Sequence, residues 1–185
     1  WEGEELIDQI NQALIEERRV KQGRQRQPSV VIADCQTVKT TMLGGIRGYD
    51  GNKKINGRKR HIVVDTQGNI IECLVHSANQ HESQTAELLM RKLKEDQFRI
   101  KKMIADGGYR GELKETAKKK YNIELEVVKR NEEKAFKIQP KRWVVERTIA
   151  WFNGYRRLSK DFERFLETGR AMVFLSSIKL SLNDF

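Results

Sequence analysis

The spacing of hydrophobic and polar residues separates helices from strands along most of this chain. Residues 4–19 repeat apolar positions at helical intervals, which predicts an amphipathic helix. The run SVVIADC at 29–35 is short and β-branched, which predicts a buried strand. HIVVDTQGNIIECLVH, at 61–76, predicts two strands joined by a TQGN turn.

The second half of the chain alternates helices and strands. It predicts a helix over 82–96, a strand over 101–106, a charged helix over 110–121, a strand over 123–130, and a helix over 140–158 that Pro140 opens. The order is strand, hairpin, helix, strand, helix, strand, helix. We therefore expect an α/β fold with a mixed sheet, in which a hairpin joins parallel strands and helices flank both.

A polar, basic segment, KQGRQRQPS, divides the chain near its start. We expect residues 1–27 to form a helical segment with a basic linker and residues 28–185 to form one folded domain. The first residue is Trp1 rather than Met, so we expect the sequence to derive from a longer protein or a truncated gene. The first helix is then the end of a missing helical domain.

The charge balance narrows the class of partner. The chain has 36 Lys and Arg against 26 Asp and Glu, a net charge of +10, which favours polyanions and above all DNA or RNA. No apolar run approaches about 18 residues and no signal peptide is present, so we expect no membrane span and a cytoplasmic protein. The two cysteines, Cys35 and Cys73, lack metal-ligand spacing and indicate a reducing compartment.

Two aspartates occupy places where ligands often bind. Asp34 closes the apolar run VVIAD, and Asp106 closes MIAD directly before two glycines. The carboxyl ends of strands in open α/β sheets form ligand crevices. Either aspartate alone is explained as well by turn or capping chemistry.

Glu146 lies on the last predicted helix, in the segment KRWVVERTIAWFNGYRRL. At about 100° per residue, one face of that helix is apolar and predicts a core contact. This face carries Val144, Trp151, Phe152, Tyr155 and Leu158. Arg142, Asn153 and Arg157 fall beside Glu146 on the opposite face, so an ion pair with Arg142 at i,i+4 is an alternative to a functional role.

The three acids together indicate a metal site. Two aspartates and one glutamate form a set of hard oxygen ligands of the kind that Mg²⁺ or Mn²⁺ prefers. Two such ions can activate water or a 3′-hydroxyl and stabilise the leaving oxygen in phosphodiester displacement. The positive charge of the remaining chain would attract the DNA backbone toward that acidic site.

Four segments resemble one known family: IADCQTVKT, GRKRHIVVDTQGNI, IADGGYRG and RWVVERTIAWFNGYRRLSKDFE. From about residue 28 to its end, the chain resembles the catalytic domain of a bacterial insertion-sequence transposase of the Asp-Asp-Glu type, in the insertion-sequence-five group. The resemblance implies an RNase H-like fold and a catalytic, metal-binding triad of Asp34, Asp106 and Glu146. It also implies Mg²⁺ or Mn²⁺ as cofactor, and hydrolysis at element ends followed by strand transfer. The implied partners are element ends, target DNA and a second copy of the chain, in the bacterial nucleoid.

The chain departs from the family pattern at two positions. Related transposases carry Tyr, two residues, Arg, three residues, Glu, six residues, Lys. Arg142 and Glu146 fit, but Gln139 and Asn153 occupy the tyrosine and lysine positions. Arg157, one turn after Asn153, is the candidate substitute for the lysine. The family's N-terminal DNA-binding region is also not recognisable here.

Candidate DNA-binding residues fall in two segments. The glycine-rich basic loop over 44–60 contributes Lys53, Lys54, Arg58, Lys59 and Arg60, and the last predicted helix contributes Arg142, Asn153, Arg156 and Arg157. The resemblance adds His81 as a further candidate near the site. Turn chemistry explains Asp65, and strand alternation turns Cys35 away from Asp34 into packing.

Two other functions account for part of the pattern. One is a truncated, non-catalytic DNA-binding remnant that occupies element ends or sequesters full-length transposase. The other is a general RNase H-type nuclease, which shares the acids but leaves the RWVVERT helix and its basic tail unexplained.

Overall fold

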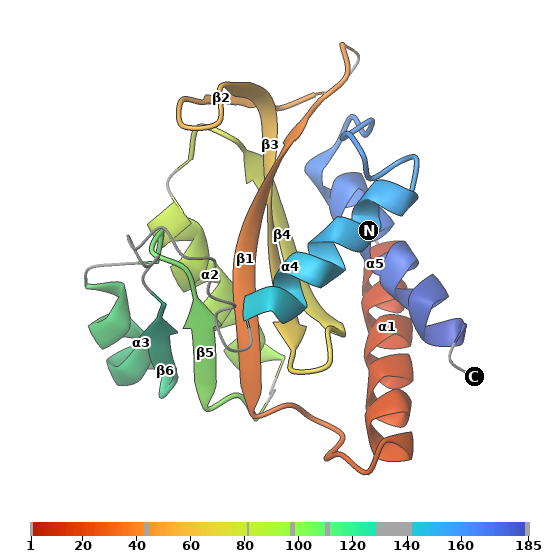
Figure 1. Ribbon diagram of the computed structural model, residues 1–185, viewed down its shortest axis with the longest axis vertical. Helices are drawn as coiled ribbons and strands as arrows, with labels where there is room; N and C mark the ends of the chain where they lie inside the picture. The colour runs from red at the N-terminus through yellow and green to blue at the C-terminus, as the bar shows by residue number, and fades with distance from the viewer. Residues whose placement is uncertain are drawn as a thin grey trace.

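The computed structural model of this protein describes residues 2–42, 45–80, 82–96, 99–109, 112–128 and 142–183 (Figure 1). Its elements are α1 (Glu2–Lys21), β1 (Val30–Lys39), β2 (Gly48–Asp50), β3 (Ile55–Asp65), β4 (Ile70–Ser77), α2 (Glu82–Glu95), β5 (Lys102–Ala105), α3 (Leu113–Tyr121), β6 (Glu124–Val127), α4 (Arg142–Trp151), a 3₁₀ turn (Phe152–Gly154) and α5 (Leu166–Leu182). None of these helices combines the length and apolarity needed to cross a bilayer.

The strands form one mixed sheet around β1. On one side β1 pairs with β3 in antiparallel register, and on the other it pairs with β5 in parallel register, followed by β6. β2 and β4 share the outer edge of β3, one pairing with its start and the other with the rest. The predicted fold class is confirmed: a hairpin joins parallel strands in one mixed sheet.

Alternation along the central strands divides the interior into two cores, because successive side chains point to opposite faces. Val31 and Ala33 of β1 pack with α2 and α3 on one face. Ile32, together with Ile104 of β5, packs with α4 and α5 on the other. Both faces of β1 are therefore covered.

Helix α1 packs against α5 and the β3–β4 hairpin (Figure 1). Its inward side includes Asn11, which donates from Nδ2 to the Ile70 carbonyl, and Ile15, which is buried in the core. Leu6 and Ile10 are exposed, so only part of the predicted apolar stripe is buried. The helix thus contributes to the packing of this fold, while the division of the chain at residue 27 stays a prediction.

The turn between β3 and β4 is fixed by Asp65, as its sequence predicted. Its Oδ1 accepts hydrogen bonds from the backbone N–H groups of Gln67 and Asn69, at 2.9 and 3.0 Å. Asp65 is also fully buried and forms an ion pair with Arg19 of α1. Turn chemistry alone therefore leaves out half of its role, because the pair joins the hairpin to α1.

The helix predicted over 140–158 is shorter in the structure. Among the described residues it begins at Arg142 and ends at Trp151, where the Phe152–Gly154 turn follows; Pro140 lies outside them. Trp151 was expected in the core but is 40% exposed, with its ring 4.9 Å from the Arg147 guanidinium. Because the helix ends there, Asn153 and Arg157 do not continue the face of Glu146.

Two further expectations change. Residues 55–60 were expected in a loop, but they begin β3, since pairing with β1 and β2 extends the strand beyond the apolar run. The C-terminal segment, for which the spacing predicted no element, forms α5. Its side chains contact α1 and β4, so apolar residues occur on more than one face of the helix. The sequence therefore lacks the single apolar face that predicts an amphipathic helix.

Candidate active site

The two aspartates are neighbours because of strand register. β1 and β5 run parallel, with Val30 opposite Lys102 and Ile32 opposite Ile104. Two residues further along each strand come Asp34 and Asp106, on the face that Ile32 and Ile104 share. β5 ends at Ala105, whereas β1 continues to Lys39. Asp34 therefore lies within its strand rather than at its end, and the sheet opens beside it because β5 stops.

Helix α4 lies across this face of the sheet and carries Glu146 (Figure 1). Val144 and Val145 are buried in the core beneath it. Further along the helix, Thr148 Oγ1 donates to the Gly68 carbonyl at 3.1 Å, next to the hairpin turn. A Cβ at Gly68 would lie 2.9 Å from Thr148 Oγ1, and its φ is +95°. Glycine therefore permits the contact that positions the helix.

Arg142 joins two of the three acids. Its Nη2 lies 3.1 Å from Glu146 Oε1 and 3.9 Å from Asp34 Oδ2. The predicted i,i+4 ion pair is present, but it does not exclude a functional site, because the same guanidinium also faces Asp34. Arg142 is 11% exposed and Glu146 is 54% exposed. The glutamate therefore projects from the helix at the mouth of the site.

The electrostatics of Asp34 reflect the crowding of carboxylates. Burial raises its pKa, and the nearby charges of Asp106 and Glu146 raise it further. The Cys35 backbone N–H, 2.8 Å from Asp34 Oδ1, and the Arg142 charge act in the opposite direction. Each of the other two acids thus destabilises the charged form of Asp34, and a cation among them would reverse that effect.

A divalent cation suits this donor set. Mg²⁺ and Mn²⁺ prefer carboxylate oxygens, and the charges of Asp106 and Glu146 both act on the carboxylate of Asp34. In the described ranges no three His, Cys, Asp or Glu side chains lie close enough to bind one ion in this conformation. Arg142 lies between Asp34 and Glu146, so a shared ion requires that arginine to turn away.

A buried hydrogen-bond chain supports both aspartates from the opposite face of the sheet. Tyr109, three residues after Asp106 and fully buried, lies with its hydroxyl 2.8 Å from His61 Nδ1. The other ring nitrogen of His61 is 3.5 Å from the Sγ of Cys35, the residue after Asp34. Cys35 therefore points away from Asp34, as predicted. One imidazole contacts the segments that carry the two acids.

His61 remains neutral in this chain of contacts. Burial lowers its pKa to about 3, and the neighbouring charges of His76 and Lys59 act in the same direction. Sequence analysis missed His61 and Tyr109 as supporting residues, since neither has an exposed or charged role. The available signal was the tyrosine that follows the two glycines after Asp106.

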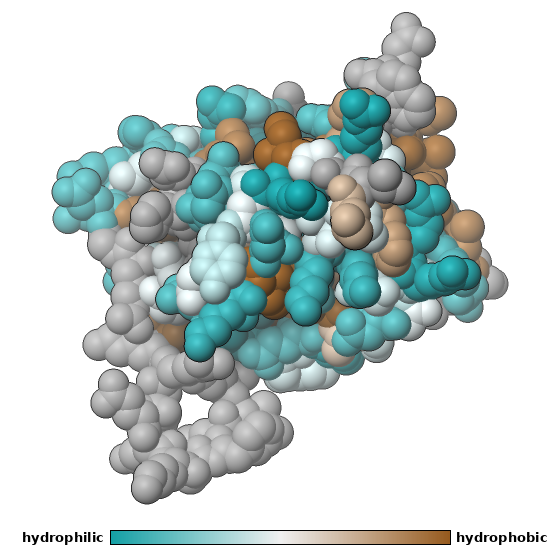
Figure 2. Space-filling view, turned by 90° about the horizontal axis from the view of Figure 1, so that it is seen from above, coloured by the Kyte–Doolittle hydropathy of each residue, from teal (hydrophilic) through white to brown (hydrophobic). Residues whose placement is uncertain are grey.

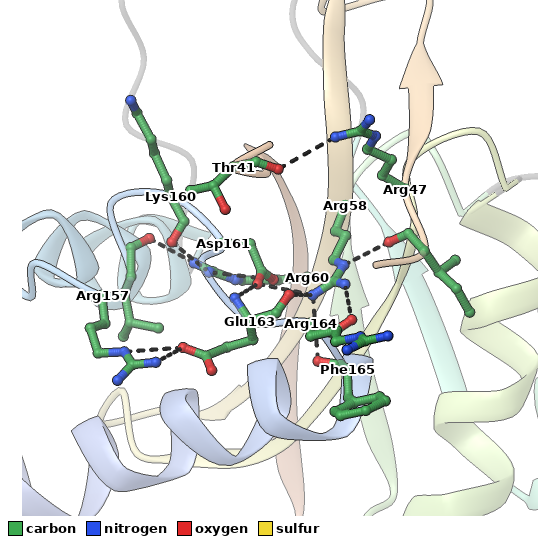
Figure 3. Close-up of polar contacts among 12 residues, drawn as sticks. Thr41, Arg47, Arg58, Arg60, Arg157, Lys160, Asp161, Glu163, Arg164 and Phe165 are labelled. Carbon is green, nitrogen blue, oxygen red and sulfur yellow. Dashed lines mark hydrogen bonds and ion pairs between the residues drawn. The ribbon is translucent and has the colours of Figure 1, made fainter. Parts of the chain in front are cut away.

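Three of the predicted DNA-binding residues are buried instead. Arg58, Lys59 and Arg60 are 0%, 8% and 1% exposed. Figure 3 shows the Arg58 guanidinium against Asp161, with Nη1 3.0 Å from Oδ1. Arg58 also donates to the carbonyls of Ile46, Glu163 and Arg164. These residues cannot contact a phosphate, because they lie in β3 and not in the exposed loop that was expected.

Arg60 continues this buried network, and the exposed Arg157 lies at its edge (Figure 3). Arg60 Nη1 donates to the Leu158 carbonyl at 2.7 Å, and its Nη2 lies 3.7 Å from Asp161 Oδ2. Arg58 and Arg60 therefore fasten the segment after α4 to β3. Arg157 is exposed, with 58% of its side chain accessible, and its guanidinium pairs with Glu163 through Nε at 3.0 Å. Its role as the substitute for the missing lysine stays a prediction, and the Glu163 carboxylate is the partner that a phosphate would replace.

The other candidates keep exposed positions. Lys53 and Lys54 lie in the turn between β2 and β3, and Asn153 and Arg156 follow α4. Figure 2, seen from the end of the molecule that carries β2, shows a mostly hydrophilic surface. Their contacts with DNA stay predictions. His81 lies outside the described residues.

Comparisons with known proteins agree on the family. The Transposase DDE domain family matches residues 25–178. A Burkholderia cepacia protein, named as a candidate transposase for insertion sequence element IS402, is 31% identical over 137 residues, covering 66% of this chain and 65% of that protein. The match thus spans just under two thirds of the relative's length.

Solved structures resemble this chain at low sequence identity. A chain from the cryo-electron microscopy structure of the simian T-cell lymphotropic virus intasome, in complex with PP2A regulatory subunit B56 gamma, gives a TM-score of 0.52 at 14% identity, over 81% of this chain and 48% of that one. The catalytic core domain of BIV integrase gives 0.47 at 14% identity, over 84% and 95%. The intasome chain supports the fold, and the family match over most of the sequence leads to one conclusion. The chain belongs to the Transposase DDE domain family.

Proposed function

We propose that this chain is the catalytic part of a transposase that hydrolyses a phosphodiester at insertion-sequence ends. The freed 3′-hydroxyl then attacks target DNA. Asp34, Asp106 and Glu146 are the proposed catalytic residues, Mg²⁺ or Mn²⁺ the cofactor, and DNA the substrate and partner. The observation that carries the proposal is the strand register, which sets Asp34 beside Asp106 on the face that α4 covers with Glu146.

The backbone positions each of the three acids in a different way. Asp34 lies within a ten-residue strand and Asp106 directly follows a buried one, so both carboxylates are held by the sheet. Gly108 N–H also donates to Asp106 Oδ1 at 3.0 Å, which limits its rotation. Glu146 is on a helix surface and more exposed, and is suited to complete the site when DNA binds.

Asp34 and Asp106 would hold the divalent ions, with Glu146 as a further ligand. Bound ions of this kind activate an attacking oxygen and neutralise charge on the phosphate. Arg142 then has an alternative partner. As a phosphodiester oxygen enters, its guanidinium can leave the carboxylates and donate to the phosphate, for which its planar fork is suited.

The test is cleavage of a labelled DNA duplex that carries the element end, in Mg²⁺ and in Mn²⁺. Wild-type protein should nick the strand, and Asp106→Asn and Glu146→Gln should each lower the rate by about a thousandfold or more, since several kcal/mol of transition-state stabilisation is lost. Unfolding temperatures should stay near wild type. Lys118→Gln, on an exposed face of α3, is the matched surface control.

Equal cleavage by wild type and both acid variants would exclude the catalytic assignment. Salt-sensitive binding of the end by wild type, with no cleavage in either metal, would instead favour the truncated DNA-binding remnant. Cleavage of any RNA–DNA hybrid, without preference for the element end, would indicate a general nuclease.

A further inference from the structure

A basic pocket lies at the opposite end of the central strands from the acids. The chain between α1 and β1, at the bottom of Figure 1, folds back against the start of β5 and encloses a pocket of about 380 Å³. Arg24, Arg99 and Lys101 line it, together with the amide side chains of Gln25 and Gln27. Its described lining contains no acidic residue, so the pocket is strongly positive.

The pocket is built by specific contacts. Arg19, which pairs with Asp65, donates from Nε to the Gln25 carbonyl at 2.8 Å and so holds the returning chain. Arg99 Nη1 donates to Gln25 Oε1 at 3.3 Å. The backbone N–H of Lys101 donates to the Ser29 carbonyl at 2.8 Å, which fixes the floor between the two strands.

The three outer cations are available for an anion. In the part of the chain that the structure describes, Arg24, Arg99 and Lys101 form no ion pair, and all three are exposed. Arg19 differs, because Asp65 already balances its charge. Guanidinium and ammonium groups that converge with amide donors on one hollow suit a tetrahedral oxyanion such as a phosphodiester.

We propose that this pocket binds a backbone phosphate of the same DNA whose end occupies the acidic site. The inference rests on the proposed function for where that DNA lies. Five residues separate Ser29 from Asp34 along β1, about 17 Å at 3.3 Å per residue. One DNA strand advances about 3.4 Å per phosphate, so the pocket lies about five nucleotides from the bond to be cut. It fixes the direction in which the duplex leaves the active site.

The test compares two variants of equal charge change by their binding of end duplexes, measured by fluorescence anisotropy without divalent metal across a salt series. Arg24→Gln with Arg99→Gln removes two pocket cations. Lys114→Gln with Lys118→Gln removes two exposed cations of α3. The pocket variant should lose about tenfold or more in affinity at 0.1 M salt, and the slope of log K against log salt should fall by about 2. The control should stay near wild type.

Duplex length sharpens the test. The two variants should bind with equal affinity to duplexes that keep fewer than about five base pairs on one side of the cleavage position. Their difference in affinity should persist when only the other side is shortened. Lys101→Gln alone should show about half the change in salt slope. This variant leaves the Arg99–Gln25 hydrogen bond intact. A loss of DNA affinity in it therefore comes from the missing charge and not from a change in the structure of the pocket.

Other outcomes overturn the proposal. Equal losses in the pocket and control variants would mean that only net charge matters. If inorganic phosphate raises the Tm of wild type but not of the pocket variant, while their DNA affinities agree, the pocket is a small-anion site only. Because binding is measured without cleavage, a wild-type protein that binds but never cuts would refute the proposed function and leave this inference standing.

Discussion

Two clusters of charge in this protein have opposite surroundings. Asp34, Asp106 and Glu146 gather where β5 stops, under a helix and partly open to solvent. Arg58, Arg60 and Asp161 lie where β3 meets the segment after α4, and each is at most 1% exposed. The three acids were predicted to bind metal ions, and Arg58 and Arg60 were predicted to contact DNA. Only the acids are accessible enough to solvent to contact a ligand.

The difference lies in how each cluster is compensated. The arginines donate to a buried carboxylate and to several backbone carbonyls, so their charges stabilise a particular chain path. The charges of Asp106 and Glu146 both act on Asp34. Arg142 contacts two of the three acids, Asp34 and Glu146, so the cluster keeps excess negative charge. A compensated cluster serves the fold, whereas an uncompensated one suits a ligand of opposite charge.

Removing the acid from the buried cluster should have the largest effect on stability. Asp161→Asn leaves Arg58 and Arg60 without their carboxylate and should cost about 3–5 kcal/mol in the free energy of unfolding. Asp106→Asn changes the same functional group at the open cluster and should leave that free energy near wild type. Urea denaturation of both proteins measures the difference, and equal losses would abolish the distinction between the clusters.

A smaller loss of stability is expected at Tyr109, which joins the buried His61 to the loop of Asp106. Tyr109→Phe removes the hydroxyl that contacts His61 Nδ1 and should cost about 1–3 kcal/mol, because a buried ring nitrogen loses its partner. The loop that carries Asp106 should also loosen. Titration with Mn²⁺, followed by calorimetry, should show weaker binding than for Tyr121→Phe, a tyrosine on α3. Unchanged Mn²⁺ affinity would limit Tyr109 to a structural role.

The raised pKa of Asp34 should produce a modest, pH-dependent change in Tm when this residue is replaced. Its pKa is raised in the folded state, so its contribution favours folding when it is protonated and is lost as pH rises through the raised value. Asp34→Asn should therefore raise the Tm at pH 7.5 by about 1–3 °C, and the gain should shrink as pH falls toward the ordinary value of 3.8. Thermal melts from pH 7.5 to 4 check this, and a gain independent of pH would contradict it.

The exposed lysines should have the least effect on folding. Lys53→Gln with Lys54→Gln removes two charges from the turn before β3 and should change the free energy of unfolding by less than about 0.5 kcal/mol. DNA binding should weaken and its salt slope should fall by about 2 if both lysines contact phosphates. An unchanged slope would remove this turn from the DNA-binding surface.

Sequence patterns predicted most of the elements, for local physical reasons, while the site of three acids stays a prediction. Alternation identified the hairpin, and short apolar runs placed Asp34 and Asp106 beside buried strands. The same reasoning failed for Arg58 and Arg60, because their neighbours in sequence are basic, glycine-rich and typical of an exposed loop. Their partner Asp161 lies about a hundred residues away, and no local pattern reports such a contact.

The sequence by itself determined the family and most of the order of elements, since these depend on residue types and spacing along the chain. It also supplied the prediction that three acids form the site. Tertiary structure decided which charges are exposed. It set Asp34 beside Asp106 through register, ended the helix of Glu146 at Trp151, and turned Arg58 and Arg60 into buried supports. The reason is physical: the burial and compensation of a charge depend on which distant segments pack around it.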